Sequence, residues 1–97
     1  MWWFEPPYAK ARPHLILTRG PVVEILSDVL AIPATRTMRG LPTEVELSVA
    51  DGMPAPGVLT ADNLSLIEKV YLTRRIMRLS SSKMLEVCGA VRAATGC

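Results

Sequence analysis

The stretch Arg12-Pro13-His14-Leu15-Ile16-Leu17-Thr18 puts a guanidinium and a ring-locked proline directly before a run of β-favouring apolar residues. Pro13 fixes its own φ and pushes the residue before it towards an extended conformation. We therefore predict a strand over residues 14–18, with Arg12 held at a defined angle where a loop over residues 5–11 becomes that strand.

A second stretch repeats this arrangement in the opposite order. Residues 29–34 form a nearly continuous apolar run that contains Pro33 and is followed by Thr35 and Arg36. A run without a polar face is typical of a strand at the centre of a fold or at an interface. The proline, which has no N–H, indicates a free side or a bulge there. The ends of the two strands could therefore present Arg12, Thr35 and Arg36 to one ligand.

Further strands and one helix surround these two stretches. Short strands are predicted over residues 2–4, 44–49, 58–61, 64–67 and 75–79, with irregular chain at 22–27, a wide turn at 51–57 and a helical turn around residue 72. Strict alternation over 44–49 predicts that Val45, Leu47 and Val49 face inwards. We expect a mainly β fold with a C-terminal α-helix, as a small, strongly bent sheet or barrel, in one domain over residues 1–97.

The C-terminal helix is predicted over residues 81–94. Ser80 is a good N-cap for it, and Gly96 is a suitable residue just past its end. Gly89 in mid-helix costs about 1 kcal/mol relative to alanine, which suggests a close backbone contact. The helix should pack against a sheet or a second subunit through one apolar face, formed by Met84, Val87, Cys88 and Val91.

Composition bounds the class of protein. Of the 97 residues 49% are hydrophobic and the mean hydropathy is +0.27, so a partner subunit would help to cover apolar surface. Charged residues or proline interrupt every apolar run before the ~20 residues needed to cross a bilayer, and the first residues lack the pattern of a signal peptide. We expect a cytosolic protein with no membrane span. Cys88 and Cys97 should be reduced and structural.

The residues available for chemistry are few. A single histidine excludes a ribonuclease that uses two, and no cluster has metal-ligand spacing and no glycine-rich phosphate loop is present. Arginine, threonine and one acid suit phosphodiester cleavage by the neighbouring ribose 2′-hydroxyl, because the substrate then supplies its own nucleophile. Each residue also has a plain alternative: Arg12 as a surface ion-pair partner, Thr35 as a turn residue, His14 as a packed side chain and Asp62 as part of an ordinary turn.

The order of motifs narrows these alternatives. The motifs are Arg12-Pro13-His14-Leu15-Ile16-Leu17-Thr18-Arg19, Ile32-Pro33-Ala34-Thr35, Leu41-Pro42-Thr43-Glu44-Val45, Asp62-Asn63, and Arg78-Leu79-Ser80 before a final helix. In this order and spacing the chain closely resembles the MazF/PemK family of toxin endoribonucleases, from Trp2 to about Ala94.

The resemblance implies an SH3-like barrel with a C-terminal helix, a homodimer, and a toxin of a type II toxin-antitoxin system. It implies sequence-specific, metal-free cleavage of single-stranded RNA to 2′,3′-cyclic phosphate and 5′-hydroxyl ends, which inhibits translation and growth. No cofactor is implied, and a MazE-like antitoxin is expected to cover the RNA groove.

The resemblance also assigns roles to residues. Arg12 matches the family's catalytic arginine and Thr35 its catalytic threonine. Asp62 stands where many members carry an acid, and it is a possible acid/base together with His14, which lies close to Arg12. The loops that grip RNA in the family, with the position after that acid, imply RNA-binding roles for five residues: Lys10, Arg36, Thr37, Arg39 and Asn63.

Two other functions remain open at this point. One is a non-enzymatic inhibitor on the same barrel, similar to the CcdB toxins that poison DNA gyrase. Those toxins end in a tryptophan-containing tail, whereas this sequence ends Ala94-Thr95-Gly96-Cys97. The other is a peptide-binding SH3-like module, which the five aromatic residues of the chain do not favour.

Overall fold

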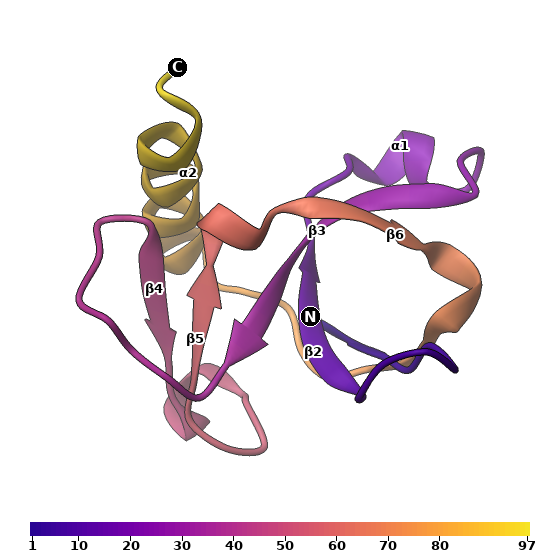
Figure 1. Cartoon of the computed structure of the whole chain (residues 1–97), viewed down its shortest axis with the longest axis horizontal. Helices are drawn as coiled ribbons and strands as arrows, with labels where there is room; N and C mark the ends of the chain where they lie inside the picture. Colours follow the sequence, from indigo (N-terminus) through magenta and orange to yellow (C-terminus); the bar gives the residue numbers. More distant parts are fainter.

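The structure is a computed structural model that describes all 97 residues. It contains one antiparallel β-sheet of seven strands and a C-terminal α-helix (Figure 1). The strands are β1 (Trp2–Phe4), β2 (Arg12–Ile16), β3 (Asp28–Thr35), β4 (Glu44–Leu47), β5 (Gly57–Thr60), β6 (Ser65–Glu68) and β7 (Leu72–Arg75). The helices are α1 (Gly20–Val23) and α2 (Ser81–Thr95), with short 3-10 turns η1 (Val49–Asp51), η2 (Ala61–Asn63) and η3 (Lys69–Tyr71).

The long central strand β3 organises the sheet. Its first half pairs with β6, its middle pairs with β2, and its last two residues pair with β5. The strands follow the order β4-β5-β3-β2-β1-β7, with β6 beside β3. In Figure 1, β3 runs from the part of the sheet that contains β2 and β6 to the part that contains β4 and β5. The predicted central strand is therefore confirmed.

The two faces of β3 supply two separate cores. Ile32 and Ala34 belong to a core of twelve buried residues that α2 covers, whereas Val29 and Ala31 belong to a second core with Phe4 and Ile67. Because successive side chains of a strand point to opposite faces, residues 29 and 31 lie on one side of β3 and residues 32 and 34 on the other. This explains why the sequence of β3 alternates so little.

The C-terminal helix forms as the sequence predicts. The Ser80 hydroxyl accepts a hydrogen bond from the Lys83 backbone N–H at 3.3 Å, and the helix ends at Gly96 in the left-handed region with φ of +71°. Val87 and Ala90 are its buried residues. α2 lies against β4 and η2 (Figure 1).

Two details of α2 differ from the prediction. Cys88 is exposed and does not share the buried face, because Ala90, three residues after Val87, takes the inward position instead. Gly89 is also exposed, and a Cβ built on it would meet nothing within 4 Å. No close backbone contact within the chain explains this glycine.

The second strand begins earlier than predicted. β2 covers Arg12–Ile16 rather than 14–18, so Arg12 lies in the strand, opposite Phe4 of β1, and not before it. Pro13 fits because the pairing of β2 with β3 starts only at His14, so the residue without an N–H lies beyond that ladder.

Three other boundaries are corrected. α1 forms a single helical turn at Gly20–Val23, which overlaps the stretch predicted as irregular. β4 ends at Leu47, and Val49, predicted to face inwards, is exposed in η1. The last strand covers Leu72–Arg75 instead of 75–79, because it pairs with the three-residue β1 and reaches the end of that partner at Arg75.

Candidate functional site

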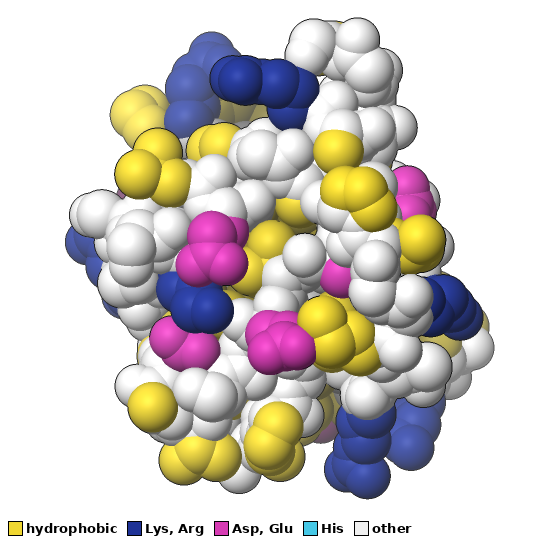
Figure 2. Space-filling model, turned by 90° about the vertical axis from the view of Figure 1, so that its left-hand side faces the viewer, with side chains coloured by type: hydrophobic (Ala, Val, Ile, Leu, Met, Phe, Trp, Pro, Cys, Tyr) yellow, Lys and Arg dark blue, Asp and Glu magenta, His cyan; other side chains and the backbone are white.

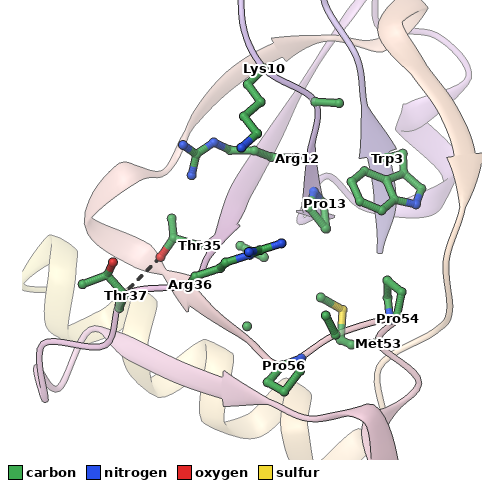
Figure 3. Close-up of a pocket in the computed structure, with 14 residues that line it drawn as sticks. Trp3, Lys10, Arg12, Pro13, Thr35, Arg36, Thr37, Met53, Pro54 and Pro56 are labelled. Carbon is green, nitrogen blue, oxygen red and sulfur yellow. Dashed lines mark hydrogen bonds between the residues drawn. The ribbon is translucent and has the colours of Figure 1, made fainter.

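A cavity of about 310 Å³ opens where β2 begins and β3 ends (Figure 3). Its walls come from the β1–β2 loop, the first residues of β2, the end of β3 and the turn before β5. The lining residues that bear on its chemistry are Trp3, Lys10, Arg12, Thr35, Arg36 and Thr37. We refer to this cavity as the basic pocket.

The strand register brings Arg12 and Thr35 together. β2 and β3 are antiparallel, with His14 opposite Pro33. Continuing this register by two residues places Arg12 opposite Thr35. The β2–β3 ladder itself ends at His14 and Pro33, but both Arg12 and Thr35 line the basic pocket, so a guanidinium and a hydroxyl from distant parts of the sequence face one opening. The two predicted catalytic residues are thus neighbours within one chain.

The basic pocket is positively charged without compensation. Lys10, Arg12 and Arg36 line it, and no carboxylate does. None of the three cations makes an ion pair, since the ion pairs of the chain belong to Lys83. Unneutralised cations around a concave surface concentrate anions. Figure 3 shows Lys10 and Arg12 on one side of the opening and Thr35 and Arg36 on the other.

The Thr35 hydroxyl is available to a ligand. Its Oγ1 donates to the Thr37 carbonyl oxygen at 3.5 Å, the long limit of a hydrogen bond (Figure 3). A ligand oxygen at a normal distance would replace this contact at little cost. The arrangement therefore offers two guanidinium groups, one ammonium group and one free hydroxyl to an anion such as a phosphodiester.

His14, a predicted acid/base candidate, does not line the basic pocket. Its side chain is 8% exposed, and its ring packs edge-on to Phe4 with centroids 5.0 Å apart. Nδ1 lies 3.2 Å from the Arg12 carbonyl oxygen, which can only accept, so Nδ1 carries the proton. Burial lowers the pKa of His14 below 6.5. The hydrogen bond to the Arg12 carbonyl oxygen opposes this shift, and the nearby Arg12 charge adds to it. The ring is therefore neutral at pH 7.

Three further predicted site residues also lie outside the basic pocket. Asp62 belongs to η2, beyond the end of β5 that is remote from Thr35, and its Oδ2 accepts a hydrogen bond from Thr43 Oγ1 at 2.6 Å. Asn63 follows it in η2. Arg39 lies in the loop after β3, where its backbone N–H donates to the Glu44 carboxylate at 3.0 Å. One chain does not bring these residues to Arg12 and Thr35.

The sequence did not predict two walls of the pocket. Trp3 lines it, and the Trp3 ring also lies 5.9 Å from the Arg74 guanidinium carbon. The turn with Pro54 and Pro56 supplies another wall, although it was predicted only as a wide turn. The two prolines were the available signal, since a turn with two fixed φ angles can form a rigid wall.

No group of three or more His, Cys, Asp or Glu side chains is arranged to hold a metal ion. No helix has the length and apolar character of a membrane span.

The fold and the pocket define a class of small protein with a bent antiparallel sheet, a C-terminal helix and a cationic pocket at a strand junction. The family model described as "PemK-like, MazF-like toxin of type II toxin-antitoxin system" matches residues 2–95. The chain belongs to this family, and the resemblance found in the sequence is confirmed.

Relatives and solved structures agree with this family. The chain is 38% identical over 96 residues to "Probable endoribonuclease MazF2" of Mycobacterium tuberculosis, covering 98% of this chain and 94% of the relative. It is 43% identical over 74 residues to "Endoribonuclease MazF3" of the same organism, covering 76% and 72%. The solved structure of "Mycobacterium tuberculosis toxin MazF-mt6" is similar with a TM-score of 0.87 and 35% identity, covering 99% of this chain and 97% of that one.

One more solved structure includes a second component. It is described as "Endoribonuclease in complex with its cognate antitoxin from Mycobacterial species" and is similar with a TM-score of 0.86 and 26% identity, covering 98% of this chain and 89% of that chain.

Proposed function

We propose that this chain is a toxin endoribonuclease that cleaves single-stranded RNA at specific sequences without a metal ion. The observation that carries the proposal is the basic pocket, in which Arg12 faces Thr35 across two strand ends and no carboxylate repels a phosphate. Three relatives and neighbours that match the chain carry the word endoribonuclease in their names. In this proposal Arg12 and Thr35 are the catalytic residues.

The proposed reaction uses the ribose 2′-hydroxyl of the substrate as the nucleophile. Its oxygen forms a bond to phosphorus and loses its proton, the bond from phosphorus to the 5′-oxygen breaks, and that oxygen gains a proton. The products are a 2′,3′-cyclic phosphate and a 5′-hydroxyl. Negative charge increases on the non-bridging oxygens, so a guanidinium and a hydroxyl fixed beside them stabilise the transition state more than the ground state.

Other residues would bind the strand or move protons. Lys10, Arg36 and Thr37 line the pocket and would hold the flanking phosphates, while Arg39 and Asn63 would contact RNA further along. The proton-transfer roles of His14 and Asp62 stay predictions, because neither lines the pocket of one chain. A neutral His14 ring has a free lone pair on Nε2, which is consistent with a base.

The proposal extends to assembly. We propose that the bent sheet forms an SH3-like barrel and that two chains form a homodimer, because apolar side chains remain exposed on β3 and β6, where Leu30 lies opposite Leu66. A MazE-like antitoxin with an acidic segment would be attracted to the basic pocket and would exclude RNA from it. Such a toxin would act in the cytosol, where inhibition of translation would stop growth.

The purified protein, incubated with a mixed RNA pool in EDTA, should produce 5′-hydroxyl ends at a restricted set of sequences. A substrate with a 2′-deoxy nucleotide on the 5′ side of the scissile phosphate should resist cleavage, because the nucleophile is absent. Efficient cleavage of the deoxy substrate would exclude the 2′-hydroxyl reaction. Intact RNA together with inhibition of DNA gyrase on supercoiled DNA would instead support a CcdB-like inhibitor.

A further inference from the structure

A second cavity, of about 340 Å³, adjoins the basic pocket. Arg36, Pro56 and Gly57 line both cavities, so the two lie side by side. The remaining walls come from β4, the following η1 turn and the start of α2. An RNA strand with its phosphate in the basic pocket would therefore place a neighbouring nucleotide at this second cavity, which we call the side cavity.

The side cavity differs chemically from the basic pocket because it contains carboxylates. Figure 2 shows acidic side chains gathered around one basic side chain on this face of the molecule. Among the lining residues, Lys83 Nζ donates to the Glu46 carbonyl oxygen at 2.9 Å and lies 4.0 Å from Asp51 Oδ2. Asp51 Oδ2 also accepts from the Ser48 backbone N–H at 2.8 Å. Lys83 and Asp51 are thus occupied by contacts within the protein.

The Glu46 carboxylate is not occupied in this way. The carboxylate makes no hydrogen bond and no ion pair. The contact between Glu46 and Lys83 involves the Glu46 backbone oxygen and leaves the carboxylate free. Val45 and Leu47 point into the core, so the alternation of β4 directs Glu46 to the outer face, at the side cavity.

An exposed carboxylate without a protein partner is free to accept hydrogen bonds from a ligand at the side cavity. A carboxylate only accepts hydrogen bonds. Of the four bases, guanine alone has two adjacent donors on its Watson–Crick edge, N1–H and N2–H. Uracil has one donor between two carbonyl groups, and adenine and cytosine each have one amino group beside an acceptor nitrogen. A carboxylate with two oxygens therefore selects guanine.

We propose that the side cavity binds the base of a nucleotide next to the scissile phosphate, and that Glu46 accepts N1–H and N2–H of a guanine there. The exposed Met38 side chain lines the same cavity and offers an apolar surface to the face of the base. The basic pocket then fixes the backbone while the side cavity reads the sequence. This inference rests on the proposed ribonuclease function and names its specificity.

The test compares cleavage maps of a random RNA pool. The wild-type enzyme should cut with guanine enriched at one position within two nucleotides of the scissile bond. In Glu46→Gln the enrichment should fall by about tenfold, the usual effect of losing one bidentate base contact, while the protein still cuts RNA. The matched control is Glu86→Gln, because Glu86 also lies near Lys83, at 3.7 Å, but does not line the side cavity.

A second arm does not depend on a protein variant. Inosine lacks the N2 amino group, so replacing the selected guanine by inosine should slow wild-type cleavage of a defined oligonucleotide by about tenfold and should change Glu46→Gln cleavage much less. Cleavage without guanine enrichment, or enrichment and an inosine effect that survive in Glu46→Gln, would overturn the inference but leave the ribonuclease proposal intact. No RNA cleavage by the wild type would overturn both.

Discussion

At the scale of single residues, Arg12 is the side chain on which the proposed chemistry depends most. It is exposed, makes no ion pair and lines the basic pocket. The fold therefore does not depend on an ion pair of this residue, in contrast to a buried, paired arginine. The charge is available to an anion in the basic pocket.

Arg12→Ala should retain the fold and lose about 10²–10³-fold in the rate of RNA cleavage, the usual cost of removing one donor from a transition-state site. Circular dichroism and thermal unfolding would report the fold, and a fluorogenic RNA substrate the rate. Arg92→Ala, which removes an exposed arginine from α2, is the control and should cut at the wild-type rate. Activity of Arg12→Ala within a few-fold of wild type would remove Arg12 from the mechanism.

His14 should make stability depend on pH near neutrality. Its pKa is lowered in the folded state, mainly by burial, so the unfolded chain binds the extra proton more readily. The stability that the neutral His14 contributes is then complete above about pH 6.5 and falls as the pH drops towards the folded-state pKa.

Urea unfolding of wild type and His14→Gln at pH 7.5 and 5.5, at one protein concentration, measures this contribution. The wild type should lose more stability than the variant between the two pH values. Glu44 and Asp51 do not confound the comparison, because hydrogen bonds from backbone N–H groups lower their pKa values from 4.5 and 3.8 and move their titration to more acid pH. Equal losses in both proteins would contradict the prediction.

At the scale of elements, the β1–β2 loop is held in place by contacts with β6 and η3. The Glu5 backbone N–H donates to the Tyr71 carbonyl oxygen at 2.9 Å, and the Tyr8 hydroxyl donates to Glu68 Oε1 at 2.6 Å. The bond to Glu68 raises the pKa of Tyr8 to about 12, so the hydroxyl remains a donor at neutral pH. These contacts hold the loop that carries Lys10.

Tyr8→Phe should loosen the position of Lys10 without changing the positions of Arg12 and Thr35 in the basic pocket. The phenyl ring keeps the edge-on contact with Tyr71, whose centroid lies 6.3 Å away, so the fold should remain intact. We expect KM for RNA to rise about threefold and kcat to change less, because binding and not the reacting atoms is affected. Steady-state kinetics give both constants. Unchanged KM would mean that the loop is fixed by other contacts.

Gly89 offers a test of α2. Its position is exposed and a Cβ has free space within the chain, so Gly89→Ala should raise the free energy of unfolding by about 1 kcal/mol through helix propensity. Chemical denaturation measures this change. Destabilisation, with a weaker dimer in sedimentation experiments, would show instead that the glycine lies at a contact between subunits.

Sequence patterns predicted elements well where a local rule dominates. Ser80 and Gly96 bound α2 because caps act locally, and the apolar run of β3 indicated a central strand. Sequence patterns predicted the bounds of a strand wrongly where pairing with a partner strand determines them. The bounds of β7 follow from pairing with β1, and the start of β2 at Arg12 follows from pairing with Phe4. Such pairings cannot be read from one segment alone.

In the candidate site, too, residues marked by a local sequence pattern were predicted, and residues brought in by the tertiary fold were not. Arg12 and Thr35 were identifiable because each lies at the end of a proline-containing strand, and the structure brings both into one pocket. Trp3 and the turn with Pro54 were missed, because their proximity depends on how the sheet bends. Asp62 was proposed from the family motif, yet one chain keeps it at the Thr43 end of β5.

At the scale of the whole molecule, charge is distributed unevenly although the net charge is only +2. Lys10, Arg12 and Arg36 surround one opening without an acid, while Glu46, Asp51 and Glu86 lie near Lys83 on the adjoining face. The small net charge therefore does not indicate the local cluster of cations that would attract an anionic ligand. Association with RNA should depend on salt through the first of these two surfaces.

The strand that carries Thr35 also contributes to both cores of the protein. Its backbone amides should consequently be among the slowest to exchange with deuterated solvent, because opening β3 requires both cores to come apart at once. The hydroxyl that we propose to be catalytic is therefore fixed to a segment that opens slowly, which leaves little scope for inactivation by local unfolding. Control of this enzyme would then have to come from blocking access to the opening, and not from deforming the scaffold behind it.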